Sequence, residues 1–120
     1  MPRRRHFALM LALLAAAPSP AFAHAILLDS TPAAGKTLPP GETILRLRFN
    51  SRIDAARSRL TLIPASAQPT ILPLAIGPSE DILTAPATLS RGPHTLRWQV
   101  LAVDGHITRG EVRFTVTGPR

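Results

Sequence analysis

The sequence has no cysteine and no tyrosine, and only 4% of its 120 residues are aromatic. Without cysteine, the chain has no disulfide, no thiolate metal site and no cysteine nucleophile. Its length is sufficient for one small domain and leaves too few residues for two hydrophobic cores. The 45% hydrophobic content is ordinary for a globular chain and argues against disorder.

The first 23 residues have the three-part layout of a secretory signal peptide. Three arginines at 3–5 are followed by an apolar run over 7–17 and by the small-residue pattern Ala21-Phe22-Ala23. The apolar run is shorter than the roughly 20 residues that a membrane-spanning helix needs. We therefore predict cleavage after Ala23 and a domain over 24–120. The alternative is a retained amphipathic anchor.

Cleavage would reduce the positive charge of the chain. Of its 14 basic residues three leave with the signal and no acidic residue does, so eleven face seven and the net charge falls from +7 to +4. The eleven are scattered along the sequence, and Phe49, Trp98 and Phe114 are the only aromatic residues left. A nucleic-acid surface would need clustered basic residues and stacking rings. The basic residues are therefore interpreted as a solvated surface, and no nucleic-acid partner is predicted.

Alternating apolar and polar residues, separated by proline and glycine, predict short β-strands. The clearest alternation is the heptapeptide Thr43-Ile44-Leu45-Arg46-Leu47-Arg48-Phe49. The prolines leave room for one helical turn at most, within 53–60. The predicted strands are 25–28, 43–49, 59–63, 71–76, 81–85, 93–100 and 111–116. About seven short strands in one small domain indicate an all-β fold, an antiparallel β-sandwich or Greek-key barrel.

His24 would become the first residue after cleavage. Its free α-amine and its imidazole Nδ1 could then close a six-membered chelate ring on a metal ion, once both nitrogens are deprotonated. The alternative is a frayed terminus in which the histidine has no role.

Asp104-Gly105-His106 is the second candidate for a metal-binding element. In extended backbone Asp104 and His106 would lie on one face, with no side chain on Gly105 to crowd an ion. The alternative is a hairpin turn in which aspartate and glycine have turn roles. Together with His24, these residues would provide three nitrogens and one oxygen, a set that suits Cu(II). His94 lies ten residues before Asp104 and is predicted to be structural or exposed, with a weak second metal contact as the lesser possibility.

The chain resembles the CopC-type periplasmic copper-binding proteins over nearly its whole predicted mature length. The matching pieces are His24-Ala25, residues 30–35 (STPAAG), residues 45–49 (LRLRF), Gly92, Trp98, Asp104-Gly105-His106 and residues 110–116 (GEVRFTV). The resemblance implies an immunoglobulin-like or cupredoxin-like fold in the periplasm. It also implies a Cu(II) site at His24, Asp104 and His106, and a multi-span inner-membrane partner of the CopD type.

The sequence departs from this family at several points. Some members have a Cu(I) site built from methionines, whereas Met1 and Met10 both lie in the predicted signal peptide. His94 stands where the family pattern has tyrosine, and Ala102 stands where serine is common. These departures affect local packing and hydrogen bonding and leave the ligand set intact.

We predict a soluble, non-enzymatic periplasmic protein that binds one Cu(II) for sequestration, resistance or delivery. The first alternative is a copper oxygenase with a histidine brace, in which Asp104 would fill a position that oxygen chemistry needs open. The second is an immunoglobulin-like interaction module without a metal.

Overall fold

The computed structural model describes residues 25–118, and these form two β-sheets. The predicted signal peptide and His24 lie outside the described residues. The strands are β1 (Leu27–Thr31), β2 (Thr37–Leu38), β3 (Gly41–Phe49), β4 (Arg59–Pro64), β5 (Thr70–Leu72), β6 (Ala75–Ile76), β7 (Ile82–Leu89), β8 (Gly92–Leu101) and β9 (Ile107–Val116). The helical content of this region is one 3₁₀ turn, η1 (Ala55–Arg57). The prediction of an all-β fold is confirmed.

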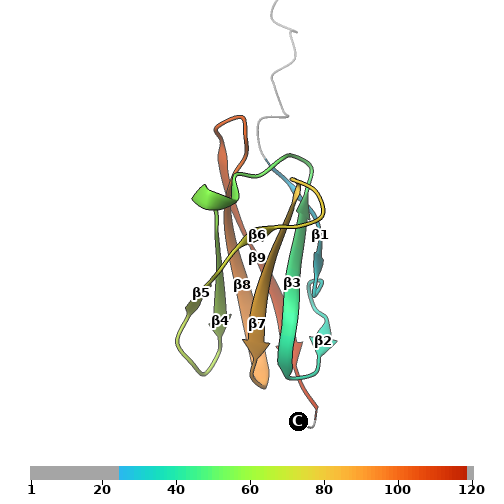
Figure 1. The fold of residues 1–120 in the computed structure, drawn as a ribbon. Coiled ribbons are helices and arrows are strands. Elements are labelled where there is room, and N and C mark those ends of the chain that lie inside the picture. Colours follow the sequence, from blue (N-terminus) through green and yellow to red (C-terminus); the bar gives the residue numbers. More distant parts are fainter. Residues whose placement is uncertain (1–24, 119–120) are drawn as a thin grey trace, which may run out of the picture.

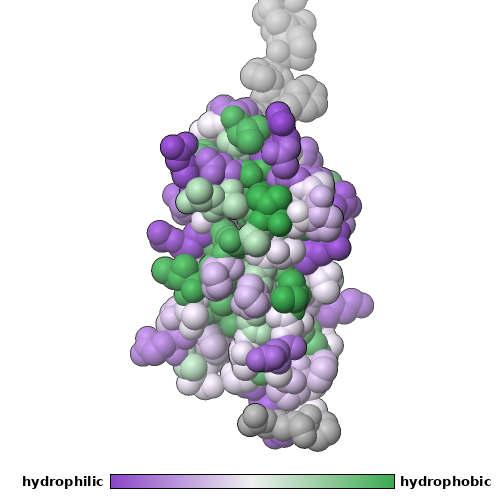
Figure 2. Space-filling model, viewed as in Figure 1, coloured by the Kyte–Doolittle hydropathy of each residue, from purple (hydrophilic) through white to green (hydrophobic). Residues whose placement is uncertain are grey.

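The two sheets are open and pack face to face, so the fold is a sandwich and not a closed barrel (Figure 1). One sheet has the strand order β1-β3-β7-β6, and the other has the order β2-β9-β8-β4-β5. Neighbouring strands are antiparallel, except that β2 runs parallel to β9. Figure 2 shows apolar residues along the middle of one face of this sandwich, with polar residues on both flanks.

The seven predicted strands correspond to eight of the nine strands in the structure. The predicted strand 71–76 is divided into β5 and β6, with Pro73 and Leu74 between them. A proline has no N–H to donate to a ladder, which favours a break at this point. The ninth strand, β2, is only two residues long and was not predicted, because two residues are too few to show an alternating pattern.

Alternation along the strands places one set of side chains in the core. In β3, Leu45, Leu47 and Phe49 are fully buried, whereas Arg46 between them is exposed. Strand β8 contributes inward-facing residues in the same way, and Trp98 is 7% exposed. The Phe49 and Trp98 rings meet edge to face at a centroid distance of 5.3 Å, which joins the two sheets.

Gly110 leaves the space that the Trp98 indole fills. The two residues are paired across β8 and β9, and a Cβ atom at position 110 would overlap the indole ring. A glycine inside a strand marks such a close approach. The indole Nε1 is buried without a hydrogen-bond partner among the described residues, so the ring is held by packing.

We expect Gly110→Ala to destabilise the domain by about 1–3 kcal/mol, because overpacking forces the indole or the backbone to shift. Chemical denaturation monitored by circular dichroism, which does not depend on Trp98, measures the change. The double variant Gly110→Ala/Trp98→Phe is the control, since a smaller ring should absorb much of the added methyl group. An unchanged unfolding midpoint in Gly110→Ala would show that the indole does not occupy this space.

Candidate metal site

Asp104-Gly105-His106 lies in the loop that connects β8 and β9, at the same end of the sandwich as η1 (Figure 1). The loop begins with a tight turn in which the Gly105 N–H donates to the Ala102 carbonyl at 2.9 Å. Gly105 has a φ of 95°, a left-handed conformation that glycine adopts without steric cost. The Ala102 N–H donates to the His106 carbonyl at 2.9 Å and closes the base of the loop.

Asp104 and His106 contact each other directly in this turn. The His106 backbone N–H donates to Asp104 Oδ1 at 3.2 Å, and the ring Nδ1 lies 3.4 Å from the same oxygen. The side chains are 39% and 51% exposed, respectively, so both can be reached from solvent. The prediction that extended backbone brings them to one face is wrong, because the aspartate makes a turn of the Asx type. The turn nevertheless brings carboxylate and imidazole together.

Backbone hydrogen bonds fix the loop to the neighbouring segment that follows β3. The Val103 N–H donates to the Arg52 carbonyl at 3.1 Å, and the Asp54 N–H donates to the Leu101 carbonyl at 2.9 Å. Between them, Ile53 and Ala102 form an isolated β-bridge, and both side chains are buried. The candidate ligands therefore stand on a supported loop, which suits a site that must hold its geometry.

The start of the described chain is anchored beside the same loop. Ala25 is 2% exposed, and its carbonyl accepts a hydrogen bond of 2.9 Å from the Thr108 hydroxyl. The next residue, Ile26, exchanges two hydrogen bonds with Asn50: its N–H donates to Oδ1 at 2.7 Å, and its carbonyl accepts from the Asn50 N–H at 3.0 Å. Thr108 is two residues past His106, so the described part of the chain begins next to the β8–β9 loop. Thr108 and Asn50 were not identified from the sequence, because no local sequence pattern indicates that they contact residues 25 and 26.

The charges at this end are of both signs. Arg52 and Glu80 form an exposed ion pair of 3.7 Å. A hydrogen bond from the Ser79 hydroxyl lowers the pKa of the Asp81 carboxyl; burial opposes this effect, and the positive charge of Arg48 adds to it. Asp81 thus stays ionised to a lower pH than an isolated carboxyl group.

No cluster of three or more potential ligands (histidine, cysteine, aspartate or glutamate) that could hold a metal ion occurs among residues 25–118. Within that range, the structure brings together Asp104 and His106, an oxygen donor and a nitrogen donor. Two such donors leave a metal with several open positions, so a tight site needs further ligands. The third predicted residue, His24, directly precedes the anchored Ala25 and lies outside the described residues.

His94 is a core residue and has no part in this loop. It is 3% exposed, its ring stacks on Phe114 at a centroid distance of 5.3 Å, and its Nδ1 lies 2.9 Å from the Gly92 carbonyl oxygen. It sits near the start of β8, whereas the candidate ligands follow the end of that strand. Of the two alternatives predicted for His94, structural or exposed, its burial supports the first and excludes the second.

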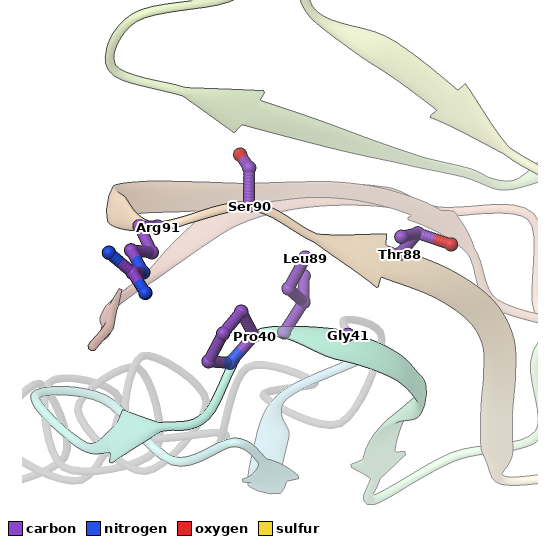
Figure 3. Close-up of a pocket in the computed structure, with 6 residues that line it drawn as sticks. All are labelled: Pro40, Gly41, Thr88, Leu89, Ser90 and Arg91. Atoms are coloured by element: carbon purple, nitrogen blue, oxygen red, sulfur yellow. The ribbon is translucent and has the colours of Figure 1, made fainter. Parts of the chain in front are cut away.

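The best-formed surface hollows of the described residues are not lined by Asp104 or His106. One of about 670 Å³ lies where the start of β3 meets the β7–β8 turn, at the opposite end of the sandwich (Figures 1 and 3). Its lining residues are Pro40, Gly41, Thr88, Leu89, Ser90 and Arg91. They include no histidine and no carboxylate, so this hollow offers no general acid–base pair. In residues 25–118, no helix has the length and apolar character needed to cross a bilayer.

These features define a small all-β sandwich protein whose candidate site is carried by a loop at one end of the sandwich. Comparison with known proteins then places it more closely. Residues 27–117 match the CopC domain. The chain belongs to the CopC family, as its sequence motifs predicted.

Two kinds of relatives support this assignment. A copper resistance protein C from Xanthomonas campestris pv. juglandis is 31% identical over 109 residues, which cover 83% of this chain and 85% of that protein. The crystal structure of CopC from Methylosinus trichosporium OB3b has a TM-score of 0.70 and 25% identity, and the match covers 78% of this chain and 93% of that one. PcoC from Escherichia coli, a methionine-rich copper resistance protein, shares the fold with a TM-score of 0.65 at 21% identity, covering 78% of this chain and 99% of its own.

Proposed function

We propose that this protein binds one Cu(II) ion in the periplasm through His24, Asp104 and His106, and that it sequesters or delivers copper. The observation that carries the proposal is the hydrogen bond between the Ala25 carbonyl and Thr108, beside the loop that holds Asp104 and His106. Consecutive Cα atoms are about 3.8 Å apart, so a ligand at residue 24 would start one peptide unit from this anchor. The copper resistance function of the Xanthomonas relative supports the choice of metal.

The donor set determines which oxidation state is favoured. His24 would supply its α-amine and imidazole once Ala23 has been removed, His106 would supply an imidazole, and Asp104 a carboxylate oxygen. Nitrogen and oxygen donors suit Cu(II), whereas Cu(I) is selected by thiolate and thioether sulfur. The residues from 24 to 120 contain no cysteine and no methionine.

Export and processing are part of the proposal, because the amine becomes a ligand only after cleavage. The signal peptide over residues 1–23 would direct the chain to the periplasm. A CopD-type inner-membrane protein would be the partner that receives or supplies the ion. The role is binding and transfer, and no chemical step is assigned to the protein.

Competition titrations of the processed protein test the proposal. We expect one equivalent of Cu(II) to bind tightly, and Cu(I) to be lost to a Cu(I) chelator at least about a hundredfold more readily, because no sulfur ligand is present. Retention of Cu(I) as tight as that of Cu(II) would contradict the ligand set. Oxygen consumption driven by the copper-loaded protein and a reductant would favour the oxygenase alternative, and absence of any copper binding would favour the metal-free module.

A further inference from the structure

Four arginines gather on the outer face of the five-stranded sheet. They and Glu111 are all the charged residues of β4, β8 and β9, and every one of them is exposed. The arginines are Arg59, Arg97, Arg109 and Arg113. Because buried and exposed residues alternate along these strands, all five side chains point to the side of the sheet away from the core. We call this surface the arginine face.

Strand pairing brings these arginines together although they are distant in sequence. In one row Arg59 is paired with Gln99, and Gln99 with Arg109. Two residues further along β8, Arg97 is paired with Glu111. Neighbouring strands lie about 4.8 Å apart, so the four guanidinium groups share one continuous, flat surface.

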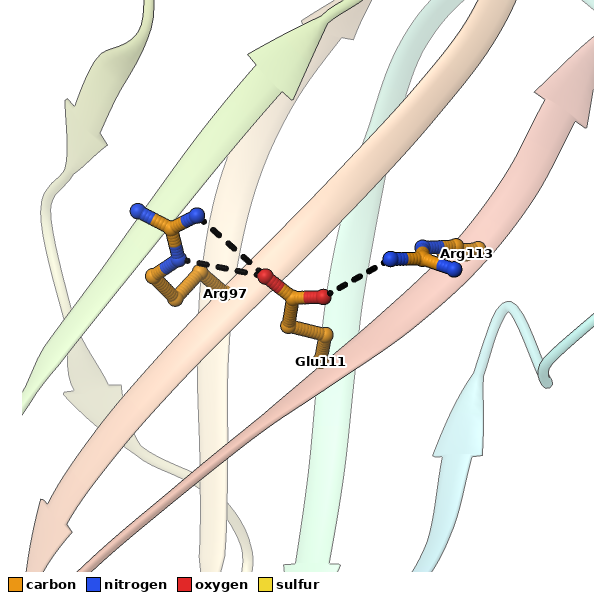
Figure 4. Close-up of polar contacts among 3 residues, drawn as sticks. All are labelled: Arg97, Glu111 and Arg113. Carbon is orange, nitrogen blue, oxygen red and sulfur yellow. Dashed lines mark hydrogen bonds and ion pairs between the residues drawn. The ribbon is translucent and has the colours of Figure 1, made fainter.

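Glu111 holds two of the arginines in place. Its Oε2 accepts hydrogen bonds from Arg97 Nε and Nη2 at 3.3 and 3.2 Å, and its Oε1 accepts one from Arg113 Nη2 at 3.3 Å (Figure 4). Arg109 donates from Nε to the neutral Gln99 Oε1 at 2.7 Å. Neither Arg59 nor Arg109 forms an ion pair with a carboxylate of the described residues. With one glutamate against four arginines, the face has a net charge of +3.

We propose that the arginine face docks the protein onto an anionic phospholipid surface. Guanidinium groups bind phosphate oxygens in a bidentate manner, and a flat sheet face can place several of them on headgroups at once. Two exposed isoleucines add apolar side chains at its borders: Ile71, in the same row as Arg97, and Ile107, the first residue of β9. Such a combination of basic and apolar groups is typical of interfacial binding.

Nucleic acid and acidic protein fit this face less well. The aromatic rings of β8 and β9, Trp98 and Phe114, point into the core, so the face has no ring on which a base could stack. The described hollow that touches the face, about 300 Å³ near Arg113 and His94, is small for a peptide segment. A planar membrane needs neither a ring nor a groove.

Cosedimentation with vesicles tests the proposal, using protein purified after expression of the full chain and kept metal-free with a chelator. We expect binding to phosphatidylglycerol vesicles at low salt, none to phosphatidylcholine vesicles, and release at about 0.5 M salt, where the Debye length is only a few ångströms. Each arginine removed should weaken partitioning about fivefold, so Arg59→Gln/Arg109→Gln should weaken it about 25-fold. Glu111→Gln should strengthen it about fivefold.

The control is Arg46→Gln/Arg91→Gln, which removes the same charge from the outer face of the other sheet and from the β7–β8 turn. We expect it to weaken partitioning less than about threefold, since only charges near the membrane contribute fully. Equal losses in the two double variants would overturn the proposal in favour of attraction by net charge.

Two further outcomes would also overturn it. If phosphate displaced the protein from vesicles while chloride of equal ionic strength did not, the face would be a site for the free ion. If the protein did not bind to the vesicles but bound polyglutamate, the partner would be an acidic protein. Because copper is absent throughout, none of these results depends on the proposed metal site.

Discussion

Adding one residue before His24 should weaken Cu(II) binding by more than about a hundredfold. The addition converts the free α-amine into a peptide nitrogen, which is not basic, so the chelate ring with the imidazole is lost while His24, Asp104 and His106 all remain. Loss of an outer-shell partner typically costs 10–100-fold in metal affinity, and the loss of a direct ligand should exceed this. Competition with a Cu(II) chelator measures the change.

The matched control for this extension is the processed protein that begins at His24. Circular dichroism should not distinguish the two, because the added residue precedes Ala25 and every strand. The unprocessed chain, in which Ala23 precedes His24, should bind copper as weakly as the extended one. If the extended protein retained full affinity, the amine would not be a ligand, and His24 would contribute an imidazole at most.

His106→Ala should have an effect of similar size, again more than about a hundredfold, because it removes the nitrogen donor that the structure places beside Asp104. The side chain is 51% exposed, so the free energy of unfolding should change by no more than about 0.5 kcal/mol. Isothermal titration with Cu(II) and a thermal melt of the metal-free variant measure the two quantities. A large loss of stability would mean that the histidine is structural.

The carboxylate can be tested without breaking the turn. Asp104→Asn keeps an oxygen that can accept from the His106 N–H, so the loop should hold while the negative charge is lost. We expect a loss of about tenfold or more in Cu(II) affinity. Glu80→Gln is the matched control, since Glu80 is an exposed carboxylate at the same end, 70% exposed and paired with Arg52. If both variants lost the same Cu(II) affinity, Asp104 would act through its long-range negative charge and not as a ligand.

The fold was largely predictable because alternation is a local property of a strand. Each residue pair such as Leu45 and Arg46 shows which face is buried, and prolines and glycines mark where strands end. The two-residue strand β2 could not be found, because it is defined by its partner β9 rather than by its own sequence. The arginine face could not be predicted from the sequence either, because Arg59 and Arg109 are far apart in the chain. They become neighbours only because both pair with Gln99 of β8.

The candidate site was predictable in its residue types and not in its geometry. Asp104 and His106 were identified by their chemistry, but their contact arises from a turn that the sequence equally allowed and that extended backbone would not produce. The anchoring of Ala25 by Thr108 is a contact across 83 residues, and no local pattern reports it. This contact fixes Ala25 next to the loop that carries the two candidate ligands.

Electron paramagnetic resonance of the processed protein with one equivalent of Cu(II) reports on all the proposed copper ligands at once. With the α-amine and imidazole of His24, the His106 imidazole and the Asp104 carboxylate as ligands, the spectrum should be that of a single tetragonal centre with hyperfine structure from three nitrogens. The extended protein should lose one of these nitrogens. A spectrum of aqueous Cu(II), or one with oxygen ligands alone, would contradict the proposed copper site.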